Sequence, residues 1–220
     1  MVTKLTALLI SLLFPLISGA DTLLFDNGAD LHIFTTLNSI NQFHQVTDDF
    51  VLNSAATLDR VVFGETTLGS ATSTPTAVDW SIGTSQFSAS VASGAGATIT
   101  AEFTGFNNGD ERNFSSSFAL PNLSLGPGTY WLTLGNGTDS FQNNTYWSVS
   151  STSAGNAQTV FGFPPAPPAG VSDLTDVPSF QIYGTVPEPG SLLLLVSAGL
   201  ACAAVCRRRS VALTCLPRPE

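Results

Sequence analysis

The chain has 220 residues, of which 16 are acidic and 7 are basic, and its charged fraction is 10%. Residues 21–186 hold 14 of the acids and two bases, Arg60 and Arg112, which gives this segment a net charge of −12. Nucleic-acid-binding proteins neutralise phosphates with Lys and Arg, so this charge balance excludes a nucleic-acid partner. All three cysteines lie beyond residue 201, which excludes a disulfide scaffold for the segment before them.

Residues 1–20 are predicted to be a signal peptide. Lys4 precedes an apolar run over residues 5–17, and small residues then follow up to Ala20. This order is typical of a segment that directs export and that signal peptidase removes. We expect cleavage between Ala20 and Asp21. A retained membrane anchor is the alternative, but the run is short for a bilayer span.

Residues 21–185 are predicted to form an all-β ectodomain. Apolar residues recur there with a period of two, which is typical of half-buried strands. Turn-forming clusters, such as 126–128 and 135–137, separate these runs. We expect an antiparallel β-sandwich of the jelly-roll type, with an up-and-down barrel as the alternative. The apolar stripes are Val78/Trp80/Ile82, Phe87/Ala89/Val91, Ile99/Ala101/Phe103, Tyr130/Leu132/Leu134 and Phe180/Ile182.

The C-terminal end has three parts in a fixed order: Val186-Pro187-Glu188-Pro189, an uncharged apolar run over residues 192–206, and the cluster Arg207, Arg208 and Arg209. The prolines hold the first part extended and accessible. As a helix, the apolar run would be about 22 Å long, so we expect a single transmembrane helix with snorkelling arginines. The positive-inside rule places the arginines on the cytoplasmic side, with residues 210–220 as a cytoplasmic tail.

These three parts, over residues 186–209, resemble the PEP-CTERM sorting signal of exported proteins from exopolysaccharide-producing Gram-negative bacteria. The resemblance implies that exosortase, a membrane-embedded cysteine-dependent enzyme, recognises Pro187-Glu188-Pro189 and removes the tail. It also implies a precursor anchored in the inner membrane, followed by delivery to the cell surface or the extracellular matrix. This chain departs from the usual pattern because eleven residues, 210–220, follow the arginines. An ordinary C-terminal anchor is the alternative.

Two segments of the ectodomain, 45–52 and 125–134, resemble a recurrent type of PEP-CTERM ectodomain. Such proteins place an Asp-Asp-Phe strand early and a Gly-Thr-Tyr-Trp strand late, and both sequences occur here. The resemblance implies a sandwich and no particular ligand.

The ectodomain lacks the sequence motifs of the common hydrolases. It has no Gly-x-Ser-x-Gly and no His-Glu-x-x-His sequence, and its histidines are His32 and His44. We therefore expect a structural or adhesive protein and not an enzyme. A secreted glycoside hydrolase is a weaker alternative, because it would need two carboxylates converging from different strands. The candidates for such a pair are Glu65, Glu102 and Glu111.

Aromatic residues favour another alternative, a carbohydrate-binding module for exopolysaccharide. Trp80, Trp131 and Trp147 are the candidate ligand-facing residues. In the adjacent pairs Tyr130–Trp131 and Tyr146–Trp147, one member of each pair is expected to face the core.

No cofactor is expected for the ectodomain, although two oxygen-rich loops are weak candidates for binding calcium. They would do so through Asp26 and Asp30 in one loop and Asp110 in the other. Both loops can equally be ordinary turns.

Overall fold

The computed structural model describes residues 21–28, 37–41, 44–106, 111–150, 157–161, 171–174 and 177–187. The regular structure in these residues consists of β-strands, and every strand pairing is antiparallel. The prediction of an all-β domain is therefore confirmed. Except for Pro187, the described residues belong to one compact unit, Met1–Val186. The predicted signal peptide (1–20) and apolar helix (192–206) lie outside the described residues.

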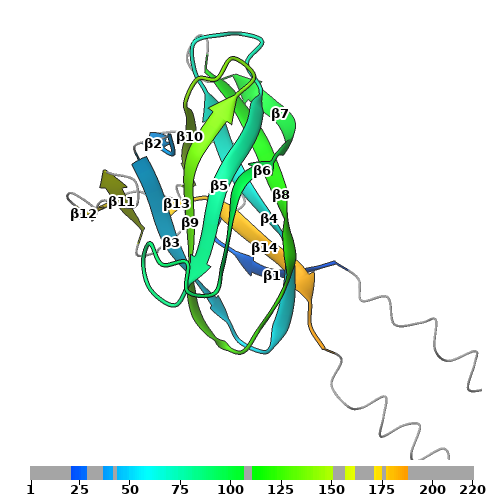
Figure 1. Ribbon diagram of the computed structural model, residues 1–220. Helices are drawn as coiled ribbons and strands as arrows, with labels where there is room; N and C mark the ends of the chain where they lie inside the picture. The colour runs from blue at the N-terminus through cyan, green and yellow to red at the C-terminus, as the bar shows by residue number, and fades with distance from the viewer. Residues whose placement is uncertain are drawn as a thin grey trace, which may run out of the picture. The chain divides into compact units, whose positions relative to one another are not determined.

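The strands form two sheets, which we name sheet A and sheet B (Figure 1). Sheet A contains β1 (Thr22–Asp26), β2 (Leu37–Ser39), β4 (Ala56–Thr67), β7 (Thr100–Phe106), β8 (Arg112–Leu125), β10 (Thr145–Ser150), β13 (Val177–Pro178) and β14 (Phe180–Thr185). Sheet B contains β3 (His44–Leu52), β5 (Pro75–Gly83), β6 (Ala92–Thr98), β9 (Gly128–Asp139), β11 (Gln158–Phe161) and β12 (Val171–Asp173).

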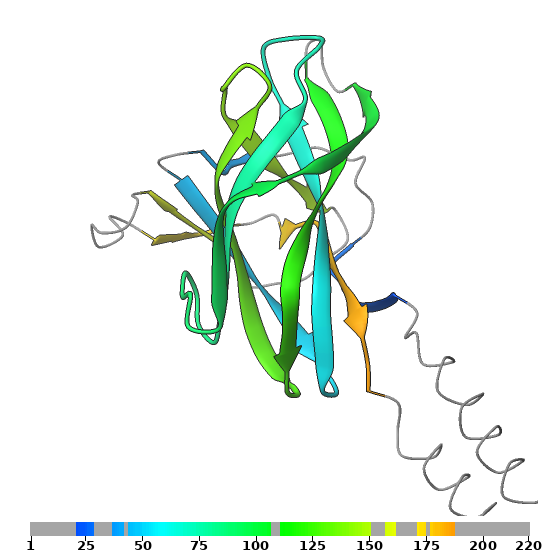
Figure 2. The same cartoon turned by 45° about the vertical axis from the view of Figure 1, so that its right-hand side comes forward.

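The order of strands in the sheets is of the jelly-roll kind. Along the chain, β3 lies in sheet B, β4 in sheet A, β5 and β6 in sheet B, β7 and β8 in sheet A, and β9 again in sheet B. The last strand, β14, returns to sheet A between β1 and β4. Figure 2 shows β14 in orange beside the dark blue β1. The first and last strands of the domain are thus neighbours.

The core lies between the two sheets and is built from alternate residues of the central strands. Val78, Trp80 and Ile82 of β5 are buried, as are Phe180 and Ile182 of β14. Both strands contribute to a single hydrophobic cluster that also includes side chains from β3, β4, β8 and β9. Burial of these side chains removes apolar surface from water, which is the main force that holds the sheets together.

Two expectations from the sequence differ from the structure. The stripe Phe87/Ala89/Val91 lies in the loop between β5 and β6, and Phe87 has a φ of 55°, which is in the left-handed region and not in the extended region of a regular strand. The expected turn at 135–137 lies inside β9, because Asn136 and Gly137 donate backbone hydrogen bonds to Asn41 and Ile40. In both places tertiary contacts override the local sequence pattern.

Candidate functional site

The expected first residue of the exported protein, Asp21, contacts sheet A. Its carboxylate accepts a hydrogen bond from the guanidinium of Arg60, and that guanidinium lies 4.1 Å from the ring centroid of Tyr183 on β14. Both charged side chains are partly exposed, so the ion pair contributes little to stability. Ala20, on the other side of the predicted cleavage point, lies outside the described residues.

The chain leaves sheet A directly before the predicted sorting motif. Thr22 pairs with Gly184, and β14 ends at Thr185. Val186 is 41% exposed and Pro187 is exposed as well. Glu188, Pro189 and the cluster Arg207, Arg208 and Arg209 lie outside the described residues. Within the part of the chain that the structure describes, no helix has the length and apolar character needed to cross a membrane.

Trp147 is a core residue, so the prediction that it faces a ligand is wrong. Its side chain is fully buried, and its rings meet Phe63 and Phe180 edge-on at centroid distances of 6.2 and 5.7 Å. Its indole Nε1 donates a hydrogen bond to the carbonyl of Ser179 at 3.0 Å. The alternation of the strand decides this placement, because Tyr146 takes the other face of β10.

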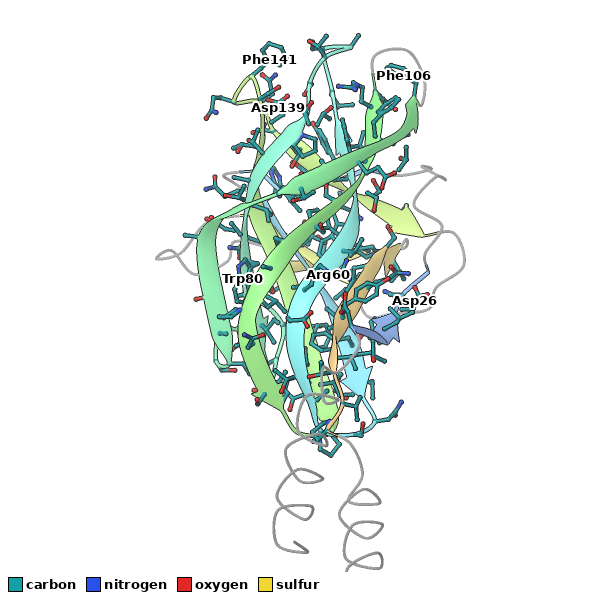
Figure 3. All side chains as sticks on the ribbon, turned by 90° about the vertical axis from the view of Figure 1, so that its right-hand side faces the viewer. Asp26, Arg60, Trp80, Phe106, Asp139 and Phe141 are labelled. Carbon is teal, nitrogen blue, oxygen red and sulfur yellow. The ribbon has the colours of Figure 1, made fainter. Side chains whose placement is uncertain are left out.

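Trp80 is nearly buried but lines the pocket described below, whereas Trp131 is accessible. Trp80, labelled in Figure 3, is 6% exposed, and its ring stacks on Phe118 at 5.9 Å. Trp131 is half-buried on the outer face of sheet B, where it pairs with Asp49 and Gly83. Of the three tryptophans, Trp131 is the least buried.

A pocket of about 240 Å³ lies on the outer face of sheet B. Ser81 and Thr133 line it, and they alternate with core residues such as Ile82 and Leu132. The pocket therefore opens away from the core. Its lining residues come from β3, β9, β5, β6 and the loop between β5 and β6: Gln45, Asp79, Trp80, Ser81, Phe87, Ala89, Ser93, Gly94, Ala95, Thr133 and Gly135.

The loop between β5 and β6 folds back over the outer face of sheet B to form one wall of the pocket. A Cβ atom at Gly83 would come within 2.2 Å of the Ser88 carbonyl oxygen, so the missing side chain leaves room for this loop. Phe87 and Ala89 of the loop line the pocket. Figure 1 shows the loop returning beside the end of β5.

Hydrogen bonds hold two polar side chains of the pocket, Asp79 and Thr133, in place. Asp79 accepts one from the backbone N–H of Gly96 and another from Nδ2 of Asn136 at 3.2 Å. Gln45 lies next to Gly135, and a Cβ atom added to Gly135 would come within 2.9 Å of the Cγ atom of Gln45. Thr133 donates to the hydroxyl of Thr47 at 2.9 Å. None of the residues that line the pocket is basic.

Glu65 is enclosed in the core and cannot meet a substrate. Its side chain is 0% exposed, and neither carboxyl oxygen has a hydrogen-bond partner of good geometry among the described residues. Burial raises the pKa of this carboxyl to about 7, while the nearby hydroxyls of Thr145 and Ser116 lower it by less and the charge of Asp139 raises it further. Glu102 is exposed on β7, so the structure does not bring these two carboxylates together at one site.

The first calcium candidate, Asp26, is the last residue of β1 and is exposed. The residue after it, Asn27, is buried and donates hydrogen bonds to Oδ2 of Asp48 at 2.5 Å and to the carbonyl of Pro178 at 3.1 Å. Asp30 and Asp110 lie outside the described residues. Within the described ranges, no three His, Cys, Asp or Glu side chains lie close enough together to hold a metal ion. Calcium binding by these loops stays a prediction.

Apart from Trp80, the pocket residues were not among the sites expected from the sequence. Asp79 and Ser81 are the polar alternates of the stripe Val78/Trp80/Ile82, so their position on an outer face could have been predicted. The proximity of these two residues to Gln45 could not have been predicted, because it depends on β3 and β5 both pairing with β9.

Comparison with known proteins identifies one segment of the chain. The family model described as the PEP-CTERM protein-sorting motif matches residues 185–209. No curated protein matches the chain. The matched segment begins at the last residue of β14 and includes the Pro-Glu-Pro sequence, the apolar run and the arginine cluster. The motif supports an exported protein that exosortase processes and sorts.

Proposed function

We propose that the chain is a cell-surface or extracellular-matrix protein whose β-sandwich has a structural or adhesive role and no enzymatic activity. The observation that carries this proposal is the position of the sorting motif directly after β14. The buried core residues of the domain lie between Ile40 and Ile182, before the motif begins. Exosortase can therefore remove the tail without removing any residue of this core.

Export in this proposal begins with the signal peptide of residues 1–20. The apolar run 192–206 then holds the precursor in the inner membrane until exosortase acts. Thr22 and Gly184 are paired, so the chain enters β1 and leaves β14 at the same end of these two strands. The rest of the domain surface is then free for contacts outside the cell.

Mass spectrometry of the protein in membrane and extracellular fractions tests the processing step. We expect an extracellular species that begins at Asp21 and ends within or just before the Pro-Glu-Pro sequence. The variant Glu188→Ala should remain in the membrane fraction with its tail intact. The matched control Glu220→Ala changes an acid outside the matched segment and should behave as the wild type. An extracellular species that still ends at Glu220 would overturn the proposal.

Exposed aromatic side chains near one end of the sandwich support the adhesive role. Phe103 and Phe106 are 43% and 58% exposed, with ring centroids 5.0 Å apart, and Phe141 is 55% exposed. Contiguous exposed apolar surface marks contact sites. Figure 3 shows Phe106 and Phe141 near the end that also holds Asp139. In the same fractions, the double variant Phe106→Ser/Phe141→Ser should be released more readily from the matrix than the control Val51→Ser, whose valine is 44% exposed. Equal release of both variants would contradict adhesion through this end.

A carbohydrate-binding module is the second candidate function. Trp147 is fully buried in the core, so it no longer supports this candidate. The pocket on the outer face of sheet B supports it independently, because a rigid sheet there carries several fixed polar groups beside aromatic side chains.

A further inference from the structure

We infer that the pocket on the outer face of sheet B binds a single ring of a neutral saccharide. The inference rests on the carbohydrate-binding candidate above and assigns to it a site and a class of sugar. Pockets for drug-sized ligands have volumes of roughly 300–1,000 Å³. At about 240 Å³, this pocket is suited to one sugar ring and not to a longer segment of a chain.

The acceptor geometry of Asp79 suits neighbouring hydroxyl groups on a sugar ring. Oδ1 accepts from the N–H of Gly96, and Oδ2 accepts from the amide of Asn136. Because each carboxylate oxygen has two lone pairs, one remains on each for a ligand. A carboxylate that is already fixed by two donors loses little conformational entropy when it accepts two more hydrogen bonds.

The other polar residues around Asp79 complement a sugar in the same way. Gln45 offers both an amide donor and an acceptor, while Ser81 and Ser93 offer hydroxyls. Phe87 is the aromatic residue of the loop wall, and aromatic side chains pack against the apolar C–H face of a pyranose. Trp131 extends the same surface beside Gly83, next to this loop.

The charge of the pocket lining favours neutral sugars over acidic ones. No basic residue lines the pocket, and Asp79 would repel a uronate carboxylate or a phosphate. The two arginines of the described residues are engaged elsewhere, since Arg60 contacts Asp21 and Arg112 donates to the carbonyl of Ser73. An anionic ring would therefore lose hydration without gaining a counter-charge. The pocket thus selects a neutral ring over an anionic one.

Ligand-observed saturation-transfer NMR on the purified full-length chain in detergent tests this inference. The neutral probes are the methyl glycosides of glucose, galactose and mannose, and the charged probes are methyl glucuronide and glucosamine. We expect saturation transfer to at least one neutral probe and none to methyl glucuronide. Absence of transfer to every neutral probe, equal transfer to methyl glucuronide, or transfer to glucosamine alone would each overturn the inference.

Variants locate the binding in the pocket. Phe87→Ala removes a loop side chain and should weaken binding of the neutral probe by about tenfold, the loss expected for one aromatic contact. Asp79→Asn should weaken it as well, whereas Asp49→Asn, an acid on the same face outside the pocket, should not. Ser81→Phe should block binding, while Ser115→Phe, on β8 in sheet A, serves as its control. Thermal unfolding of each variant shows whether it is folded.

The binding test is independent of the proposed export and sorting. Binding is measured on the purified chain, so it does not depend on exosortase. Unchanged binding by both Phe87→Ala and Ser81→Phe in folded protein would place the sugar elsewhere and overturn the inference, while leaving the sorting motif untouched.

Discussion

Glu65 is a fully buried acid whose carboxyl oxygens lack a good hydrogen-bond partner among the described residues. It lies on the core face of β4, opposite Phe114 of β8 and Trp147 of β10. A buried acid without a good hydrogen-bond partner is unfavourable when it is ionised, and this is why burial raises its pKa from 4.5 to about 7. The arginine nearest in register, Arg112 on β8, stacks instead over Phe103 and Phe114.

This shift predicts how stability depends on pH. Because the folded-state pKa lies above the unfolded one, the folded protein binds more protons between pH 4.5 and about 7. The contribution of Glu65 to stability is therefore fully present below pH 4.5 and falls as the pH rises to about 7. The expected loss is about 3 kcal/mol. Urea unfolding at pH 4, 6 and 8 measures it.

Substitution of Glu65 isolates this effect. Glu65→Gln keeps the shape without a charge, so it should remove the loss and give a more stable protein than the wild type at pH 8. Glu102→Gln, at an exposed position on β7, should leave the pH dependence unchanged. Burial of Asp139 raises its pKa, but hydrogen bonds from Ser73, Asn143 and Phe141 outweigh this and hold the pKa below 3.8, outside the tested window. An unchanged slope in Glu65→Gln would contradict the assignment.

At the scale of elements, the loop between β5 and β6 depends on one glycine. A side chain at Gly83 would meet backbone atoms of Ser88, which cannot rotate away as a flexible side chain could. We therefore expect Gly83→Ala to displace the loop, raise amide exchange over residues 85–90 and weaken the wall that carries Phe87. Hydrogen exchange followed by mass spectrometry measures the change.

The control for this loop prediction is another glycine in a connection. Gly126 lies between β8 and β9, and a Cβ there would meet nothing within 4 Å. Gly126→Ala should leave exchange unchanged throughout the domain. If Gly83→Ala also left amide exchange unchanged, other contacts would have to hold the loop in place.

The loop between β5 and β6 was wrongly predicted as a strand, whereas other apolar stripes were predicted correctly. The stripes Val78/Trp80/Ile82 and Phe180/Ile182 were predicted correctly because strand alternation is a local property. Phe87/Ala89/Val91 shows the same alternation, yet it lies in a loop. This loop can pack against the outer face of sheet B because Gly83 has no side chain there. The pocket could not be predicted either, since Gln45 and Asp79 are far apart in sequence and meet only through β9.

At the scale of the whole molecule, the described domain is acidic and ends where the matched sorting motif begins. Residues 21–186 carry a net charge of −12, and their core needs no cysteine. In this jelly-roll order, the last strand, β14, is needed to complete sheet A and the core. β14 pairs with β1 on one side and with β4 on the other, and it supplies Phe180 and Ile182 to the core.

This arrangement predicts a sharp limit to truncation of the domain. A chain of residues 21–186 should unfold cooperatively in urea, because it retains the whole described core. A chain of residues 21–178 lacks β14, and loss of buried Phe and Ile side chains costs roughly 2–5 kcal/mol each. That sum is comparable to the total stability of about 5–15 kcal/mol of a typical domain, and β1 would also lose its strand partner. We therefore expect no cooperative transition for residues 21–178 by circular dichroism. A cooperative transition in that shorter chain would show that β14 is dispensable, and that the sorting motif does not follow directly on the strand that completes the domain.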